Sequence, residues 1–125
     1  MSFDAVGIVS EKPERSIEFF NILGVDIKQY ADTGHYEGVT SSGVRIMLDS
    51  LASMKEHVPG YTKKNGNGVV LCFKQTSPYD VNDVYQKLMV AGFQSVKEPF
   101  NAVWGHRYAC VSDPDGNQID LFAEL

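Results

Sequence analysis

The sequence has only two cysteines, a single tryptophan and no long apolar run. No segment approaches the roughly 20 consecutive apolar residues that a membrane-spanning helix needs. The start, Met1-Ser2-Phe3-Asp4, lacks the basic and then apolar pattern of a signal peptide. Cys72 and Cys110 lie in strand-like segments without metal-binding spacing, so we expect free, buried thiols. These absences together predict a cytoplasmic protein that does not enter a membrane.

Basic side chains are scarce as well. Lys and Arg total 11 against 16 Asp and Glu, which gives a formal net charge of −5. An acidic chain of this kind disfavours nucleic acid or an anionic membrane surface as a partner. The chain has 125 residues, of which 43% are hydrophobic. That length is typical of one domain, residues 1–125, with an adequate core.

Apolar periodicity and turn residues predict the same order of elements twice: strand, helix, strand, strand, strand. In the first half, residues 1–50, we expect a helix over 13–23 and strands over 3–9, 25–30, 35–40 and 43–49. In the second half, residues 67–125, we expect a helix over 80–91 and strands over 69–75, 93–97, 106–111 and 118–122. Residues 51–67 are polar and turn-rich, which indicates a connection between the halves.

Each helix has one apolar stripe, which must be covered by one face of a sheet. The other sheet faces then remain for a cleft. The sequence therefore predicts an α+β fold of two tandem βαβββ units, forming a curved, mainly antiparallel eight-stranded sheet around that cleft.

The segment Asp113-Pro114-Asp115-Gly116 separates two alternating strands near the end of the chain. Proline fixes φ in the turn and glycine can take the left-handed conformation that closes it. Ile119 and Leu121 point to one face of the second strand, so Asp120 points to the other. A carboxylate in mid-strand between apolar neighbours is either solvated or part of a site.

The order of elements, with Trp104-Gly105-x-Arg107 and Asp113-Pro114-Asp115-Gly116-Asn117-x-Ile119-Asp120-Leu121, resembles the vicinal oxygen chelate superfamily. That group includes glyoxalase I, the fosfomycin- and bleomycin-resistance proteins and extradiol dioxygenases. Glu14-Arg15-Ser16-Ile17-Glu18-Phe19-Phe20 and Leu23-Gly24-Val25 also fit, so the resemblance covers nearly the whole chain. It implies a homodimer, because many members complete the cleft with strands from a second chain.

The resemblance also implies four metal-ligand positions, on the first and last strands of each unit. In this chain they correspond to Ala5, Met47, Val70 and Asp120. Alanine and valine have no donor atom, and a thioether is a poor ligand for hard or borderline cations. Only Asp120 matches, so we expect no metal cofactor; a divalent metal stays a disfavoured alternative.

Strand alternation predicts which side chains line the cleft. Asp120 should lie opposite Cys110, while Arg107, Ala109 and Val111 should face the helix layer. The expected ligand-binding residues are Trp104, His106, Tyr108, Cys110, Asp120, Phe122, Arg45, Met47 and Val70.

Structural roles compete with ligand binding for several of these side chains. Trp104 and Phe122 would also fill a dimer interface. Asp120 would equally pair with Arg45 as a structural ion pair. His35 and His57, in turn and connecting regions, are expected on the surface.

An aromatic lining with a few charged groups is typical of a small-molecule pocket. The favoured function is a metal-free binding protein of the bleomycin-resistance type, holding an aromatic or cationic ligand. The alternative is a metal-dependent lyase, isomerase or dioxygenase acting on a small vicinal-oxygen substrate. It would require His106, His35 or Glu37 to join Asp120 as a metal ligand. A protein-interaction module with an occluded cleft is the third possibility.

Overall fold

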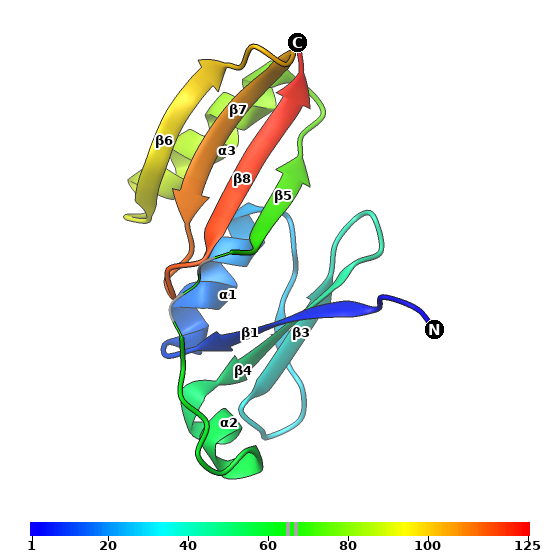
Figure 1. The fold of residues 1–125 in the computed structure, drawn as a ribbon, viewed down its shortest axis with the longest axis vertical. Helices are drawn as coiled ribbons and strands as arrows, with labels where there is room; N and C mark the ends of the chain where they lie inside the picture. The colour runs from blue at the N-terminus through cyan, green and yellow to red at the C-terminus, as the bar shows by residue number, and fades with distance from the viewer. Residues whose placement is uncertain (65, 67) are drawn as a thin grey trace. The chain divides into compact units, whose positions relative to one another are not determined.

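The computed structural model describes residues 1–64, 66 and 68–125, which form two compact units, Met1–Lys64 and Asn65–Leu125. Each unit contains one four-stranded mixed sheet, and in the second unit α3 lies across one sheet face (Figure 1). The predicted α+β class and the repeated order of elements are confirmed. None of the described helices has the length and apolar character required to span a bilayer.

The first unit consists of β1 (Ala5–Ser10), α1 (Pro13–Ile22), β2 (Lys28–Gln29), β3 (His35–Val39), β4 (Arg45–Ser50) and α2 (Leu51–His57). The second consists of β5 (Val70–Lys74), α3 (Pro78–Val90), β6 (Gln94–Asn101), β7 (His106–Ser112) and β8 (Gln118–Glu124).

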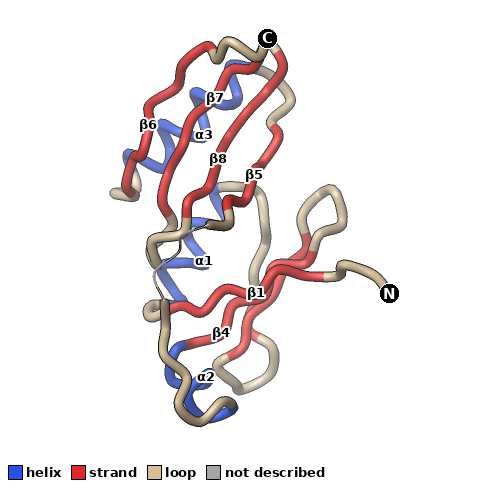
Figure 2. The backbone as a smooth tube through the Cα atoms, in the orientation of Figure 1, coloured by secondary structure: helices blue, strands red, loops and turns tan. Residues whose placement is uncertain are grey.

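The strands form two separate sheets, shown in red in Figure 2, and not the single eight-stranded sheet that the sequence predicted. The first sheet has the order β1-β4-β3-β2 and the second the order β5-β8-β7-β6. In each, the first strand of the unit pairs with the last in parallel and the remaining pairs are antiparallel. Each unit thus satisfies its hydrogen bonds with its own strands, and among the described residues no pairing joins the sheets.

Two further expectations about secondary structure were wrong. The connection after residue 50 begins with the helix α2, because the Ser50 side chain accepts a hydrogen bond from the Ser53 backbone N–H at 3.1 Å and caps its start. The expected strand over 25–30 is reduced to β2, since Val25 and Ile27 are buried in the core as irregular backbone. Residues 65 and 67 of the predicted connection lie outside the described residues.

The core of the first unit lies between α1 and its sheet. Phe19 and Phe20 of α1 and Leu48 of β4 are fully buried. Ser10 and Ser16 hydroxyls share a buried hydrogen bond of 2.7 Å that joins β1 to α1. This polar pair is satisfied internally, so its burial carries little penalty.

The core of the second unit lies between α3 and β7–β8. Ala109 and Val111 are fully buried, and Arg107 donates a hydrogen bond from Nε to Asn82 Oδ1 of α3 at 3.0 Å. These three residues face the helix as predicted. Val81 and Leu88 complete the α3 side of this core. The alternate residues of the same strands therefore belong to the sheet face opposite α3.

Gly38 of β3 packs closely against the loop between α1 and β2. A Cβ atom at this position would lie 2.5 Å from the backbone oxygen of Asp26. Gly7 of β1 is a matched control, because its nearest neighbour would be the Met47 methyl at 3.9 Å. We expect Gly38→Ala to lower the free energy of unfolding by about 2 kcal/mol, and Gly7→Ala to leave it within about 0.5 kcal/mol.

Urea unfolding of both variants checks this difference. Equal stability of the two variants would contradict the close approach at Gly38.

Candidate functional site

The turn between β7 and β8 fixes which residues of these strands lie side by side. Asp113, which is 4% exposed, accepts hydrogen bonds from the backbone N–H groups of Asp115 and Asn117 and from the Asn117 amide. Burial raises the pKa of Asp113 although these hydrogen bonds oppose the shift. The resulting register places Cys110 opposite Asp120, as predicted.

Seven of the nine predicted ligand-binding residues belong to the second unit. Six lie on the sheet strands or at the entry to β7, on the face opposite α3, and Val70 lies at the start of β5. We call this surface the aromatic face; its members are Phe100, Trp104, His106, Tyr108, Cys110, Asp120 and Phe122. The remaining two predictions, Arg45 and Met47, belong to the first unit.

Asp120 is the buried carboxylate of the aromatic face and is only 6% exposed. Tyr108 donates its hydroxyl hydrogen to Oδ2 at 2.5 Å, and the Gln118 amide donates to Oδ1 at 2.9 Å. Burial and the hydrogen bond to Asp120 raise the pKa of the Cys110 thiol to about 12, and the same two causes raise the pKa of Tyr108. Both groups are therefore protonated donors at neutral pH.

Within the described ranges, the side chains hydrogen-bonded to this carboxylate are neutral. In the described part of the chain, no lysine, arginine or histidine forms an ion pair with Asp120. A cation or a strong hydrogen-bond donor beside a carboxylate that is held by neutral groups would add a charge-assisted interaction.

Tyr108, which donates to Asp120, belongs to a cluster of aromatic rings on this face. The centroid of the Tyr108 ring is 5.4 Å from that of Trp104, 6.0 Å from that of Phe100 and 6.2 Å from that of Phe122. His106 lies 5.2 Å from the Phe122 ring. Trp104 is 57% exposed, so a large part of this aromatic surface is accessible.

Phe100 was not among the predicted ligand-binding residues, because its strand was expected to end at Lys97. The strand β6 continues to Asn101 through irregular pairing on both sides of Lys97. The Lys97 ammonium lies 4.2 Å from the centroid of the Phe100 ring. Phe100 therefore already contacts a cation within the chain.

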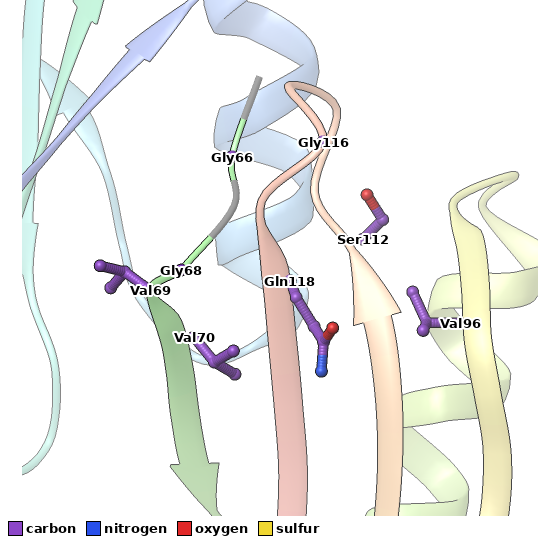
Figure 3. Close-up of a pocket in the computed structure, with 8 residues that line it drawn as sticks. All are labelled: Gly66, Gly68, Val69, Val70, Val96, Ser112, Gly116 and Gln118. Carbon is purple, nitrogen blue, oxygen red and sulfur yellow. The ribbon is translucent and has the colours of Figure 1, made fainter. Parts of the chain in front are cut away.

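A hollow of about 140 Å³ lies at the end of the second sheet near Gln118 (Figure 3). Its lining comprises Gly66, Gly68, Val69, Val70, Val96, Ser112, Gly116 and Gln118. Because the Gln118 amide also donates to Asp120, the hollow is adjacent to the buried carboxylate. Its volume is below the roughly 300 Å³ of a typical small-molecule site, so it would hold part of a ligand.

Cys72 is exposed and Cys110 is half-buried, and both are free thiols. The expectation of free thiols is confirmed, whereas the expectation that both are buried was wrong for Cys72. The cause is its position on β5, an edge strand of the second sheet. Burial raises the pKa of the Cys72 thiol, which keeps it protonated at neutral pH.

Arg45 and Met47 lie on the face of the first sheet opposite its buried residues. Arg45 pairs with Asp4 at 2.5 Å and with Glu37 at 3.4 Å. The sequence left open whether Arg45 pairs with Asp120. In the structure, the partners of Arg45 lie in the first unit and those of Asp120 lie in the second.

His35 is not a simple surface histidine, which corrects the sequence-based expectation. Its Nδ1 lies 2.8 Å from Asp49 Oδ1 and its Nε2 lies 2.8 Å from Glu37 Oε2. Hydrogen bonds to Glu37 and then to Asp49 raise the pKa of His35. His57, by contrast, is exposed at the end of α2.

The four positions implied for a metal do not offer a ligand set. Ala5, Met47 and Val70 supply no suitable donor, and both oxygens of Asp120 already accept hydrogen bonds. Among the described residues, no group of three His, Cys, Asp or Glu side chains is placed to hold a metal ion. These residues do not fit a metal centre of the kind that the resemblance implies.

The interaction of His35 with two carboxylates makes the stability of the fold pH-dependent. Because the folded-state pKa lies above the unfolded value of about 6.5, this stabilisation is fully present below that pH. It is lost as the pH rises through the folded-state pKa. Urea unfolding at a series of pH values should show this decrease in the native protein and in His57→Gln, but not in His35→Gln. The same profile in all three proteins would contradict this assignment.

Several solved structures have a fold similar to that of this chain. Solved structures with this fold include hypothetical protein SA1046 from S. aureus, with 18% identity, a TM-score of 0.83 and coverage of 98% of this chain and 92% of that chain. A glyoxalase/bleomycin resistance protein/dioxygenase family enzyme from Burkholderia phytofirmans has 15% identity, a TM-score of 0.83 and coverage of 98% of both chains. A glyoxalase-related enzyme from Fulvimarina pelagi has 15% identity, a TM-score of 0.84 and coverage of 98% and 88%.

At these identities the solved structures show the fold alone. No curated protein sequence matches the chain. The family model of the Glyoxalase/Bleomycin resistance protein/Dioxygenase superfamily matches residues 2–121. The chain therefore belongs to this superfamily.

Proposed function

We propose that this protein binds a small aromatic or cationic molecule on the aromatic face, without a metal cofactor and without catalysing a reaction. The observation that carries the proposal is the placement of Asp120. This carboxylate is 6% exposed and is held by neutral donors, one of which is Tyr108, whose ring packs against the exposed Trp104 ring. The residues proposed to contact the ligand are the predicted ones of the second unit, with Phe100 and Gln118 added.

The binding energy would come from two sources. Covering apolar surface contributes roughly 25 cal/mol per Å², and Trp104 and Phe122 offer such surface. A cationic group would gain from the Asp120 charge and from the faces of the rings. Sequestration, the function proposed here, requires no more than this binding energy.

A ligand larger than the hollow beside Gln118 needs a further wall. We propose that a second copy of the chain supplies it, so that the protein acts as a homodimer. Exposed apolar side chains next to the hollow support this proposal: Val70 is 42% exposed and Val96 is 53% exposed. We place the protein in the cytoplasm, and its two free thiols fit a reducing compartment.

In a thermal-shift screen of aromatic amines and of neutral compounds of matched shape, we expect some compounds to raise the melting temperature of the protein. A compound that binds only the folded protein stabilises it by about 2.7 kcal/mol at a concentration of 100 times Kd. Asp120→Asn should weaken the cationic compounds about tenfold and leave neutral ones nearly unchanged. Trp104→Ala should weaken both classes about tenfold.

Val103→Ala is the matched control, because Val103 is adjacent to Trp104 and fully exposed. It should bind like the native protein. Each variant is compared with its own ligand-free melting temperature, which separates lost binding from lost stability. A screen without stabilising compounds, or compounds insensitive to both Asp120→Asn and Trp104→Ala, would refute the proposal.

The absence of a metal cofactor is tested by elemental analysis of protein purified without a metal-affinity tag. We expect zinc, nickel, iron and manganese far below one atom per chain, because only one of the four implied ligand positions carries a donor. A stoichiometric metal that is lost in Asp120→Asn would restore the lyase, isomerase or dioxygenase alternative.

A further inference from the structure

The first unit contains a second hollow that the proposed function does not use. It has a volume of about 470 Å³ and is lined by Tyr30, His35, Asp49, Ser53, Met54 and His57, among others. This volume lies within the roughly 300–1,000 Å³ of small-molecule sites. All of these residues belong to the unit Met1–Lys64, so the hollow is formed within that unit alone.

The walls of this hollow are held together at Gly34. The Gly34 carbonyl accepts a hydrogen bond from the Ser50 backbone N–H at 2.8 Å, which fixes the loop against the start of α2. A Cβ atom on Gly34 would lie 2.5 Å from Ser50 Oγ and 2.7 Å from Ser53 Cβ, so only glycine permits this approach. The hollow is therefore bounded by the loop before β3, by α2 and by the adjoining strands β3 and β4.

A row of five charged groups ends at this hollow. We call it the charged row: Asp4, Arg45, Glu37, His35 and Asp49, in which each neighbouring pair forms an ion pair. Both ring nitrogens of His35 meet carboxylate oxygens at 2.8 Å, so both must carry hydrogen and the ring is an imidazolium. Three carboxylates then face two cations, which leaves one net negative charge.

The charged row has a carboxylate with a single ion-pair partner at each end, Asp4 at one and Asp49 at the other. Asp49 is the last member of the charged row, its ion-pair partner is His35, and it lines the hollow. Glu37, by contrast, is shared between two cations. A positively charged ligand in the hollow would give Asp49 a second partner.

The remaining lining suits an amine with an apolar group. His57 Nδ1 lies 2.7 Å from the Ser53 carbonyl oxygen, to which it donates, and this leaves Nε2 as the acceptor nitrogen whenever the ring is neutral. Tyr30 packs edge-on against His35 with 6.2 Å between ring centroids and is 64% exposed. The Tyr30 ring and the Met54 thioether offer an aromatic and a polarisable surface.

We propose that this hollow is a binding site for a small primary arylalkylammonium ion. The ammonium group donates to Asp49 and reaches the acceptor nitrogen of His57, and the aromatic group lies against Tyr30 and Met54. The residues of this site all belong to the first unit, whereas Asp120 and the aromatic face belong to the second, and the inference does not rest on the function proposed for them.

Nuclear magnetic resonance titration with 2-phenylethylamine near pH 8 tests this proposal, since an alkylamine is protonated there while an ordinary imidazole is neutral. We expect saturable shifts of the Met54 methyl and His57 ring signals. The neutral analogue 2-phenylethanol should bind at least tenfold more weakly, because it has the same ring without the charge. Equal affinity of the two probes, or no saturable shift, would overturn the proposal.

Matched variants distinguish binding of the amine at this site from its nonspecific attraction to an acidic protein. Asp49→Asn should weaken the amine about tenfold, while Asp26→Asn, whose side chain is 77% exposed and pairs with Lys28, should leave it unchanged. If Asp49→Asn does not fold, Tyr30→Ala at the exposed rim of the hollow replaces it and should also weaken the amine. Equal amine affinity in the native protein and the folded variant would overturn the proposal.

Asp120→Asn separates this inference from the proposed function. It should leave the Met54 and His57 shifts intact. Shifts confined to Trp104 and Tyr108 signals, and lost in Asp120→Asn, would overturn the second site and leave the proposed function standing.

Discussion

The register of the β7–β8 hairpin determines the chemistry of the second sheet. Asp113 holds the turn through hydrogen bonds with the backbone of Asp115 and Asn117, and this places Cys110 opposite Asp120. A slip of one residue would turn Asp120 into the core against α3 and expose Ile119 and its neighbours. Tyr108 would lose its carboxylate partner at the same time. The aromatic face therefore depends on the register that this turn sets.

The two units have the same strand order but differ in the side chains opposite their helices. In the second unit, one buried carboxylate is held by neutral donors among aromatic rings. In the first unit, a charged row neutralises most of its own charge and ends at a hollow beside α2. The repeated backbone thus supports two surfaces with different chemistry, which agrees with the general separation of fold from function.

Local sequence patterns were sufficient to predict the helices α1 and α3, most strands and the position of Asp120. Proline and glycine in the turn, with alternating apolar residues, fixed that orientation. The interaction of His35 with Asp49 was not predictable, because the two residues become neighbours only through β3–β4 pairing. Phe100 was missed because β6 continues past an irregularity at Lys97. The helix α2 was missed because its Ser50 cap lay within a segment interpreted as turn-rich.

The central claim is that Asp120 recognises a donor group of a bound molecule and does not coordinate a metal. A crystal structure of the protein with its tightest cationic ligand tests this claim most directly. We expect the ligand over the Tyr108 and Trp104 rings, with its charged group within hydrogen-bonding distance of the Asp120 carboxylate. A metal ion coordinated by Asp120 and two further protein donors would contradict it.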